Sequence, residues 1–161
     1  MPSSGKSTLG RRLAKELGYT FIDLDQMIVN DQDLSIPDIF SKYGEDYFRE
    51  VESRLLKSIA PNQKYLVATG GGAPCFFDNM DYILESGVSV YLDVPVEELA
   101  QRIKEYAKDD RPLLSGLTDL ETALAAKLAE RVKYYSRAHL TLDSETNFLE
   151  FIQLLQRLVN E

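Results

Sequence analysis

The sequence predicts an α/β fold in which a parallel sheet carries helices on both faces. Segments with the periodicity of strands and of helices alternate along the 161 residues, and this alternation is typical of parallel sheets. The sequence GKST, which is typical of phosphate loops, stands directly before the first helical segment. No repeat or linker interrupts the alternation, so we expect a single domain over residues 1–161.

The first helix is predicted over 6–17, where Leu9, Leu13 and Leu17 fall on one face and Gly18 can end the helix. Apolar runs and amphipathic stretches predict the later elements, which are a strand at 19–25, a helix at about 36–59, a strand at 64–72, a helix at 78–87 with Asp78 as a possible N-cap, a strand at 88–94, a helix from Pro95 to about 106, an exposed loop at 108–119, a helix at about 120–137, a strand at 139–143 and a helix at about 146–159. The sequence therefore predicts four strands.

Composition restricts the classes of partner. The net charge is −8, with 26 acidic and 18 basic residues, so neither nucleic acid nor an anionic membrane is expected as the main partner. The single cysteine, Cys75, excludes an internal disulfide and a cysteine-cluster metal site. No stretch approaches the ~20 apolar residues that span a membrane, and no signal-peptide pattern is present. We expect a cytoplasmic protein.

The N-terminal stretch MPSSGKST resembles the end of the phosphate-loop pattern G-x-x-x-x-G-K-[ST], whose first glycine would fall at position 0. Free backbone N–H groups and the positive end of the helix dipole at 6–17 would suit a triphosphate. Lys6 could reach the outer phosphates, and the Ser7 hydroxyl could coordinate Mg²⁺. An accidental GKST is the alternative, which the amphipathic helix directly behind it disfavours.

Asp23 and Asp25 lie at the carboxyl end of the strand FIDLD, the end at which open α/β sheets bind ligands. Two carboxylates there could hold the water shell of a metal and a substrate hydroxyl. A capping aspartate at a strand-to-helix turn is the alternative.

The triple glycine Gly70, Gly71 and Gly72 ends another strand. Each glycine costs roughly 0.5–1 kcal/mol of conformational entropy relative to alanine, so three in a row suggest that a ligand approaches the backbone closely. A flexible turn is the alternative.

Three arginines are ambiguous when each is taken alone. Arg49 in GEDYFREVE reads as a solvent-exposed helix residue paired with a nearby glutamate. Arg111 in DDRPLL could be a surface arginine or the arginine of a lid that closes over the transferred phosphate. Arg131 looks ordinary, and His139 and Cys75 are interpreted as structural.

Taken together, these segments resemble shikimate kinase, a small P-loop member of the nucleoside-monophosphate-kinase-like group. The resemblance rests on GKST, the D-x-D of Asp23 and Asp25, GEDYFREVE, TGGGAPC, RPLL and ERVKYYSRAH, which occur in the family's order and at similar spacing over nearly the whole chain. It implies a three-layer α/β/α P-loop kinase fold, with a substrate-binding region at about 25–55 and a lid at about 106–118. A monomer is expected.

The resemblance also implies the reaction and its residues. The reaction would be ATP-dependent phosphorylation of shikimate to shikimate 3-phosphate, with Mg²⁺ as cofactor, in aromatic amino acid biosynthesis. The implied roles are ATP binding by Ser3, Ser4, Gly5, Lys6, Ser7, Thr8, Arg102 (near the adenine) and Arg111; shikimate binding by Asp25, Arg49, Gly70, Gly71, Gly72 and Arg131; metal support by Ser7 and Asp23; and catalysis by Lys6, Asp25 and Arg111.

The chain departs from the family pattern at its start. The family has five parallel strands in the order 2-3-1-4-5, and the first strand and the first loop glycine are not found in this sequence, while Ser3 stands where the family usually has glycine. Loss of a central strand would leave two unpaired strand edges. We therefore expect the 161-residue chain to be poorly soluble or inactive, and a chain extended by about ten upstream residues to be neither.

Two other functions remain open. Another small-molecule kinase of the same architecture, such as a gluconate or nucleotide kinase, is disfavoured by the arginine pair and the triple glycine. A non-catalytic nucleotide-binding relative is disfavoured by the intact Lys6, Ser7, Asp23, Asp25 and Arg111.

Overall fold

The structure of this protein is a computed structural model, and it describes residues 1–106 and 117–160. Arg111 and most of the expected lid lie outside the described residues. The elements in chain order are α1 (Lys6–Leu17), β1 (Thr20–Asp23), α2 (Leu24–Gln32), α3 (Ile36–Ser58), β2 (Tyr65–Ala68), the 3₁₀ turn η1 (Ala73–Cys75), α4 (Asn79–Ser86), β3 (Val90–Leu92), α5 (Val96–Tyr106), α6 (Leu117–Tyr135), β4 (Leu140–Leu142) and α7 (Phe148–Asn160). The predicted alternation and the four predicted strands are confirmed.

The strands form two parallel pairs rather than one continuous sheet. β1 pairs with β2, with Thr20 opposite Tyr65, and β3 pairs with β4, with Val90 opposite Leu140. Among the described strands, β2 and β3 do not pair with each other. The pairing of neighbours agrees with the expected order, in which these two pairs lie on either side of the family's first strand.

A cavity of about 730 Å³ lies between the two strand pairs. Residues of β2, of β3 and of the apolar face of α1 line it, and Met1, Ser4 and Lys6 lie on its wall. The inner edges of β2 and β3 therefore face a largely apolar space instead of each other. The described strands therefore form two pairs on either side of this cavity, as expected when the family's first strand is not found in the sequence.

α1 begins and ends where the sequence predicts. Gly18 adopts the left-handed conformation (φ 67°), and its N–H donates to carbonyl oxygens of the last turn, at Ala14 and Lys15. Only glycine takes this conformation without steric cost, so Gly18 ends α1 and turns the chain into β1. α1 packs on both β1 and β2, with its first turn at the carboxyl ends of the strands.

The long helix α3 is interrupted at Gly44, whose φ of 83° and ψ of 175° are not helical. The second half of α3, after this break, buries Phe48, Val51 and Leu55 in a core shared with Leu24 of α2. Arg49 and Glu52 lie on this same inward-facing half. Charged residues of α3 therefore lie in the interior of the protein, beside its apolar core.

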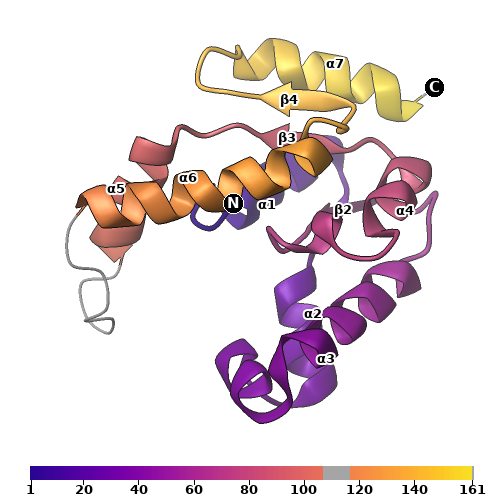
Figure 1. Cartoon of the computed structure of the whole chain (residues 1–161). Coiled ribbons are helices and arrows are strands. Elements are labelled where there is room, and N and C mark those ends of the chain that lie inside the picture. The colour runs from indigo at the N-terminus through magenta and orange to yellow at the C-terminus, as the bar shows by residue number, and fades with distance from the viewer. Residues whose placement is uncertain (107–116, 161) are drawn as a thin grey trace.

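Figure 1 shows α2 and α3 as a lobe at the bottom of the view, with α5 and α6 above it on the left, β2 near the centre, and β3 and β4 at the top beside α7. α2 was not predicted; it begins directly at the end of β1. The helices that the structure describes include none that is both long and apolar enough to span a membrane.

Candidate active site

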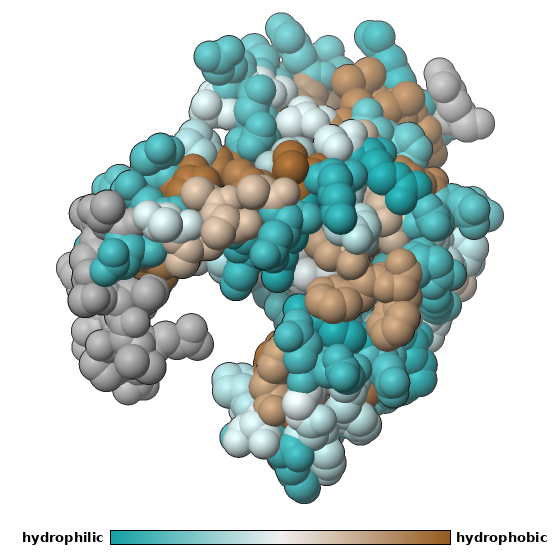
Figure 2. Space-filling view, in the orientation of Figure 1, coloured by the Kyte–Doolittle hydropathy of each residue, from teal (hydrophilic) through white to brown (hydrophobic). Residues whose placement is uncertain are grey.

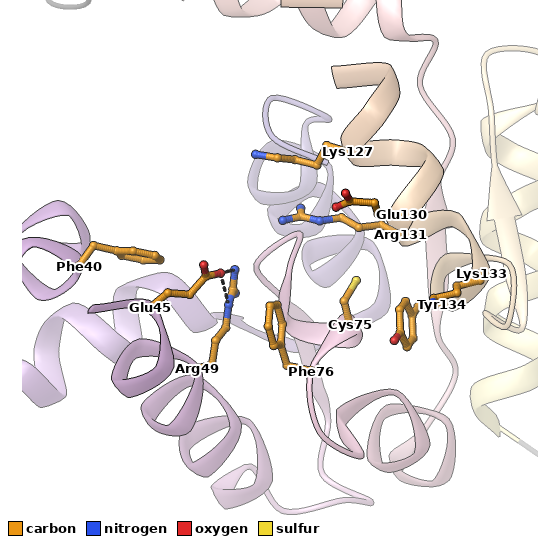
Figure 3. A pocket seen from close by; sticks show the side chains of 10 residues that line it. All are labelled: Phe40, Glu45, Arg49, Cys75, Phe76, Lys127, Glu130, Arg131, Lys133 and Tyr134. Carbon is orange, nitrogen blue, oxygen red and sulfur yellow. Dashed lines mark hydrogen bonds and ion pairs between the residues drawn. The ribbon is translucent and has the colours of Figure 1, made fainter. Parts of the chain in front are cut away.

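A cavity of about 620 Å³ opens between α3, η1 and α6. Arg49 of α3 and Arg131 of α6 both line it, together with Cys75 and Phe76 (Figure 3). On the surface, the space between the α2–α3 lobe and the side of α5 and α6 is deeply hollowed (Figure 2). Two arginines that are far apart in the sequence therefore share one pocket.

Arg49 is buried, with 8% of its surface exposed. Its Nη1 donates to Glu52 Oε2 at 2.8 Å, while Nε and Nη2 donate to Glu45 Oε1 at 3.2 and 3.1 Å. The guanidinium also stacks over the ring of Phe76, with Cζ 4.2 Å from the ring centroid. Interpreting Arg49 as a solvent-exposed helix residue is therefore wrong, because this part of α3 packs in the core and Glu52 and Phe76 enclose the guanidinium.

Glu52 is the buried partner that sequence reasoning missed. It is 1% exposed, and its contact with Arg49 is a charge-assisted hydrogen bond between residues three apart on one helix. Burial raises the pKa of Glu52, and the Arg49 guanidinium opposes that rise. The R-x-x-E spacing was visible in the sequence, but the same spacing is common on exposed helix faces.

Each of the three glycines at 70–72 approaches a charged side chain closely. A methyl group at Gly72 would lie 2.5 Å from Arg49 Nη1, and one at Gly70 would lie 2.8 Å from Glu52 Oε1. A methyl group at Gly71 would lie 3.2 Å from Arg131 Nη1. The glycine loop thus lets the backbone pass against both arginines of the pocket, which a merely flexible turn would not require.

Asp23 lies at the end of β1, next to the first helix turn of α1. Its Oδ2 accepts a hydrogen bond from Ser7 Oγ at 2.8 Å, and its Oδ1 accepts from the backbone N–H groups of Asp25 and Gln26 at 3.1 and 3.4 Å. Asp23 is therefore the N-cap of α2 and also the partner of the phosphate-loop serine. The capping interpretation is confirmed, and the support of a metal by Asp23 stays a prediction.

Asp25 lies in the first turn of α2 rather than on the strand, which corrects the expected position. It still faces the glycine loop, since a methyl group at Gly70 would lie 3.2 Å from Asp25 Oδ1. Desolvation by the surrounding protein raises the pKa of Asp25, and the neighbouring charge of Asp23 raises it further. Lys6 and Arg49 act in the opposite direction.

The phosphate-loop residues lie at the start of α1. Lys6 Nζ donates to the carbonyl oxygen of Met1 at 3.2 Å, and burial lowers the pKa of Lys6. Ser4 Oγ is buried and has no hydrogen-bond partner among the described residues. Ser3 adopts a positive φ of 54°, a conformation that favours glycine, at the position where the family usually has glycine. The loop therefore has polar groups available for a ligand.

Arg102 lies against the same loop. Its Nη1 donates to the carbonyl oxygen of Ser3 at 3.2 Å, and its Nη2 pairs with Glu98. The side chain of Arg102 is thus close to the phosphate loop.

The residues 1–106 and 117–160 contain no cluster of three or more metal-ligating His, Cys, Asp or Glu side chains. The hydrogen-bonded hydroxyl and carboxylate of Ser7 and Asp23 fit Mg²⁺, which usually takes few protein oxygens and shares phosphate oxygens of the substrate. Cys75 and His139 were interpreted as structural. Cys75 instead lines the pocket, although burial raises the pKa of its thiol, while His139 accepts a hydrogen bond from the Ser89 N–H at 3.1 Å.

The chain is similar to known shikimate kinases over nearly its whole length. The family model "Shikimate kinase" matches residues 2–158. The shikimate kinase of Parabacteroides distasonis is 44% identical over 149 residues, which cover 91% of this chain and 86% of the relative. That of Bacteroides fragilis is 37% identical over 164 residues, covering 98% of this chain and 91% of the relative.

Solved structures give the same result. The shikimate kinase of Bacteroides thetaiotaomicron superposes with a TM-score of 0.85 at 32% identity, covering 99% of this chain and 94% of the other. A shikimate kinase from Acinetobacter baumannii in complex with shikimate gives a TM-score of 0.80 at 34% identity, covering 98% and 87%.

Proposed function

The chain belongs to the shikimate kinase family and catalyses the ATP-dependent phosphorylation of shikimate, and we propose how its described residues carry out that reaction. The observation that carries the proposal is the single pocket that Arg49 and Arg131 share beside the glycine loop. The expected phosphate-loop and acidic residues lie at the start of α1 and of α2, and Asp25 lies against the same glycine loop.

The two arginines would bind the carboxylate of shikimate. A small hydroxy acid offers little apolar surface, so its recognition depends on charge-assisted hydrogen bonds of about 1.5–3 kcal/mol each. Glu52 holds Arg49 from the buried side, whereas Glu45, whose side chain is 54% exposed, can move aside for a substrate carboxylate. Gly70, Gly71 and Gly72 keep this space open, because any side chain there would meet a charged group.

The start of α1 would bind the phosphates of ATP through Gly5, Lys6, Ser7, Thr8 and the adjacent Ser3 and Ser4. The N–H groups of the first helical turn have no partner within the helix and can donate hydrogen bonds to an anion. Lys6 would exchange the Met1 carbonyl for the transferred phosphoryl group, and Ser4 Oγ would gain a partner. Arg102 would approach the nucleotide from α5.

Mg²⁺ would be held by Ser7 directly and by Asp23 through water. When bound, it would neutralise the charge that develops during phosphoryl transfer. Ser7 and Asp23 are already joined by a hydrogen bond of 2.8 Å, so both oxygens lie on the same side of the phosphate loop.

Asp25 would bind a shikimate hydroxyl and accept its proton. In that step the hydroxyl oxygen would form a bond to the γ-phosphorus, the bond from that phosphorus to the β–γ bridging oxygen would break, ADP would leave, and the proton would pass to the Asp25 carboxylate. The raised pKa of Asp25 makes it a better proton acceptor than an ordinary aspartate. Arg111, outside the described residues, is proposed as the lid arginine that reaches the phosphates.

The experiment is a measurement of ADP release by the purified chain with Mg-ATP and one acceptor at a time: shikimate, shikimate methyl ester, gluconate or none. We expect release with shikimate, and much weaker release with the ester, which lacks the charge that Arg49 and Arg131 would bind. Release by the 161-residue chain would overturn the inactivity expected from its sequence, whereas release only by a chain extended by about ten upstream residues would support that expectation. Equal release with shikimate and its ester would contradict the arginine assignment. Release with gluconate alone would identify another small-molecule kinase, and ATP binding without release would identify a non-catalytic relative.

The cellular location and oligomeric state are further proposals. The use of ATP and the single half-buried thiol of Cys75 support a cytoplasmic enzyme. The expected monomer remains a prediction, which size-exclusion chromatography with light scattering tests.

A further inference from the structure

Tyr135, the last residue of α6, connects that helix to the glycine loop. Its hydroxyl donates to the carbonyl oxygen of Gly71 at 2.5 Å. Tyr135 stands four residues after Arg131, so both side chains project from the same face of α6. One face of α6 therefore carries both Arg131, which lines the pocket, and the Tyr135 hydroxyl, which binds the glycine loop at Gly71.

The ring of Tyr135 is fixed by packing. The residue is 7% exposed and belongs to a core cluster with Leu99, Ala100 and Leu124. Its ring stacks on that of Tyr91 in β3, with the centroids 5.2 Å apart. The hydroxyl therefore points at Gly71 from a rigid base.

Gly71, which accepts this hydrogen bond, also lies next to Arg131. A methyl group at Gly71 would lie 3.2 Å from Arg131 Nη1, so the Arg131 guanidinium contacts the same residue whose carbonyl oxygen is bonded to Tyr135. A small displacement of that segment would change both the space for Arg131 and the distance to Arg49, which lies against Gly72.

We propose that Tyr135 is a positioning residue for substrate binding, whose hydroxyl holds the Gly71 carbonyl so that Arg131 and the glycine loop keep the spacing that a carboxylate needs. This inference rests on the proposed binding of the shikimate carboxylate by Arg49 and Arg131. Tyr135 makes no contact with the reacting atoms in this account and acts through the loop and Arg131.

The protonation state of Tyr135 agrees with this role. Burial raises the pKa of the Tyr135 hydroxyl, with the nearby Arg131 opposing the rise, so the hydroxyl remains a donor throughout the neutral range. A loop carbonyl oxygen that loses such a donor in a buried setting is left without its partner.

The test compares Tyr135→Phe with Tyr91→Phe. Both variants keep the aromatic stack and remove one hydroxyl, but the Tyr91 hydroxyl donates to Asp93 at 3.0 Å and does not touch the glycine loop. We expect Tyr135→Phe to raise the KM for shikimate about fivefold to thirtyfold, with kcat and the KM for ATP changed less than twofold. We expect Tyr91→Phe to leave all three constants within twofold.

Thermal melting of both variants separates positioning from loss of structure. A fall in shikimate affinity for Tyr135→Phe with no fall in ATP affinity supports the proposal. Equal effects on both substrates, or an unchanged shikimate KM, would overturn it. The double variant Tyr135→Phe/Arg131→Lys adds a second criterion, because independent effects of the two changes would also overturn a role exercised through Arg131.

The proposed function fails separately from this inference. If the unmodified chain shows no preference for shikimate over its methyl ester, the carboxylate assignment itself is wrong, whatever Tyr135→Phe does. If the preference is present and is unchanged in Tyr135→Phe, only the positioning role is wrong.

Discussion

The two ends of the active site differ in how far their polar groups are already satisfied. One end, where the carboxylate of shikimate is proposed to bind, contains Arg49 and Glu52, which are buried as an ion pair. At this carboxylate end the glycine loop at 70–72 packs closely against both side chains. At the phosphate end, Lys6 rests on a main-chain carbonyl and Ser4 Oγ has no partner among the described residues. Ser4 and Lys6 also border the cavity between the two strand pairs.

This difference indicates that the carboxylate end is preorganised and that the phosphate end takes its final arrangement with the nucleotide. A preorganised site spends little binding energy on ordering its own side chains. In the phosphate loop, the Ser4 hydroxyl has no partner among the described residues and Lys6 donates only to the Met1 carbonyl oxygen, so both groups can form new hydrogen bonds when an anion binds. Substitutions at the carboxylate end and at the phosphate end should therefore have separable effects.

The largest expected effect is on Arg49. Arg49→Met leaves Glu52 buried without its partner, so we expect the free energy of unfolding to fall by about 3–5 kcal/mol and shikimate binding to be lost. Urea unfolding and calorimetric titration measure the two effects. The double variant Arg49→Met/Glu52→Gln should recover part of the stability but no binding, and full recovery of binding would contradict the account.

At the other end, Lys6→Met should lower kcat by about 10²–10³, because in the proposed mechanism Lys6 leaves the Met1 carbonyl and stabilises charge on the transferred phosphoryl group. Binding of shikimate alone should stay within about twofold, since Lys6 is outside the carboxylate end. Lys15→Met is the control, because Lys15 is exposed on the same helix. A loss of shikimate binding in Lys6→Met equal to its loss of kcat would show that the two ends are not separable.

A single methyl group tests the close packing of the glycine loop. Gly72→Ala places a Cβ 2.5 Å from Arg49 Nη1, so Arg49 must shift, and we expect the KM for shikimate to rise on the order of tenfold. Gly87→Ala is the matched control, because a Cβ at Gly87 meets nothing within 4 Å. Steady-state kinetics give the KM for shikimate of both variants. Equal values would mean that Arg49 can shift without weakening shikimate binding.

The smallest effect is a shift in one titration. Carbon-13 NMR of the side-chain carboxyls should show Asp25 titrating above the ordinary aspartate value of about 3.9, and Asp23→Asn should move it down. Because its pKa is higher in the folded than in the unfolded chain, this group makes the protein more stable as pH falls through the folded pKa. An Asp25 pKa below the ordinary value would contradict both its desolvation and its suitability as a proton acceptor.

Local sequence signals predicted the phosphate end more completely than the carboxylate end. GKST before an amphipathic helix, Gly18 at the helix end and Asp23 after a strand are short-range patterns, and the structure has α1, its cap and the Ser7–Asp23 contact at these positions. The helix α2 was not predicted as an element, although the alternative interpretation of Asp23 as a capping residue at a strand-to-helix turn marks its start.

The carboxylate end depends on contacts between distant parts of the chain, which local patterns do not reveal. In the sequence, Arg49 and Glu52 look like residues of an exposed helix face. Only the packed structure shows that both are buried. Likewise, nothing around Tyr135 in the sequence points to Gly71. The arginine pair was expected only through the family resemblance.

The division of the sheet into two pairs, by contrast, follows from the sequence. In the family's order the first strand lies between these two pairs, and the sequence analysis does not find that strand, so β2 and β3 were expected to remain unpaired with each other. The apolar cavity between β2 and β3 is a property of the assembled chain.

Hydrogen–deuterium exchange of the whole chain, with shikimate alone and with Mg-ATP alone, tests the difference between the two ends most directly. We predict that peptides covering 45–56 exchange slowly already in the free protein and change little with shikimate, whereas peptides covering 1–9 become protected only with Mg-ATP. Slow exchange at 1–9 in the free protein, together with fast exchange at 45–56 until shikimate binds, would contradict the account.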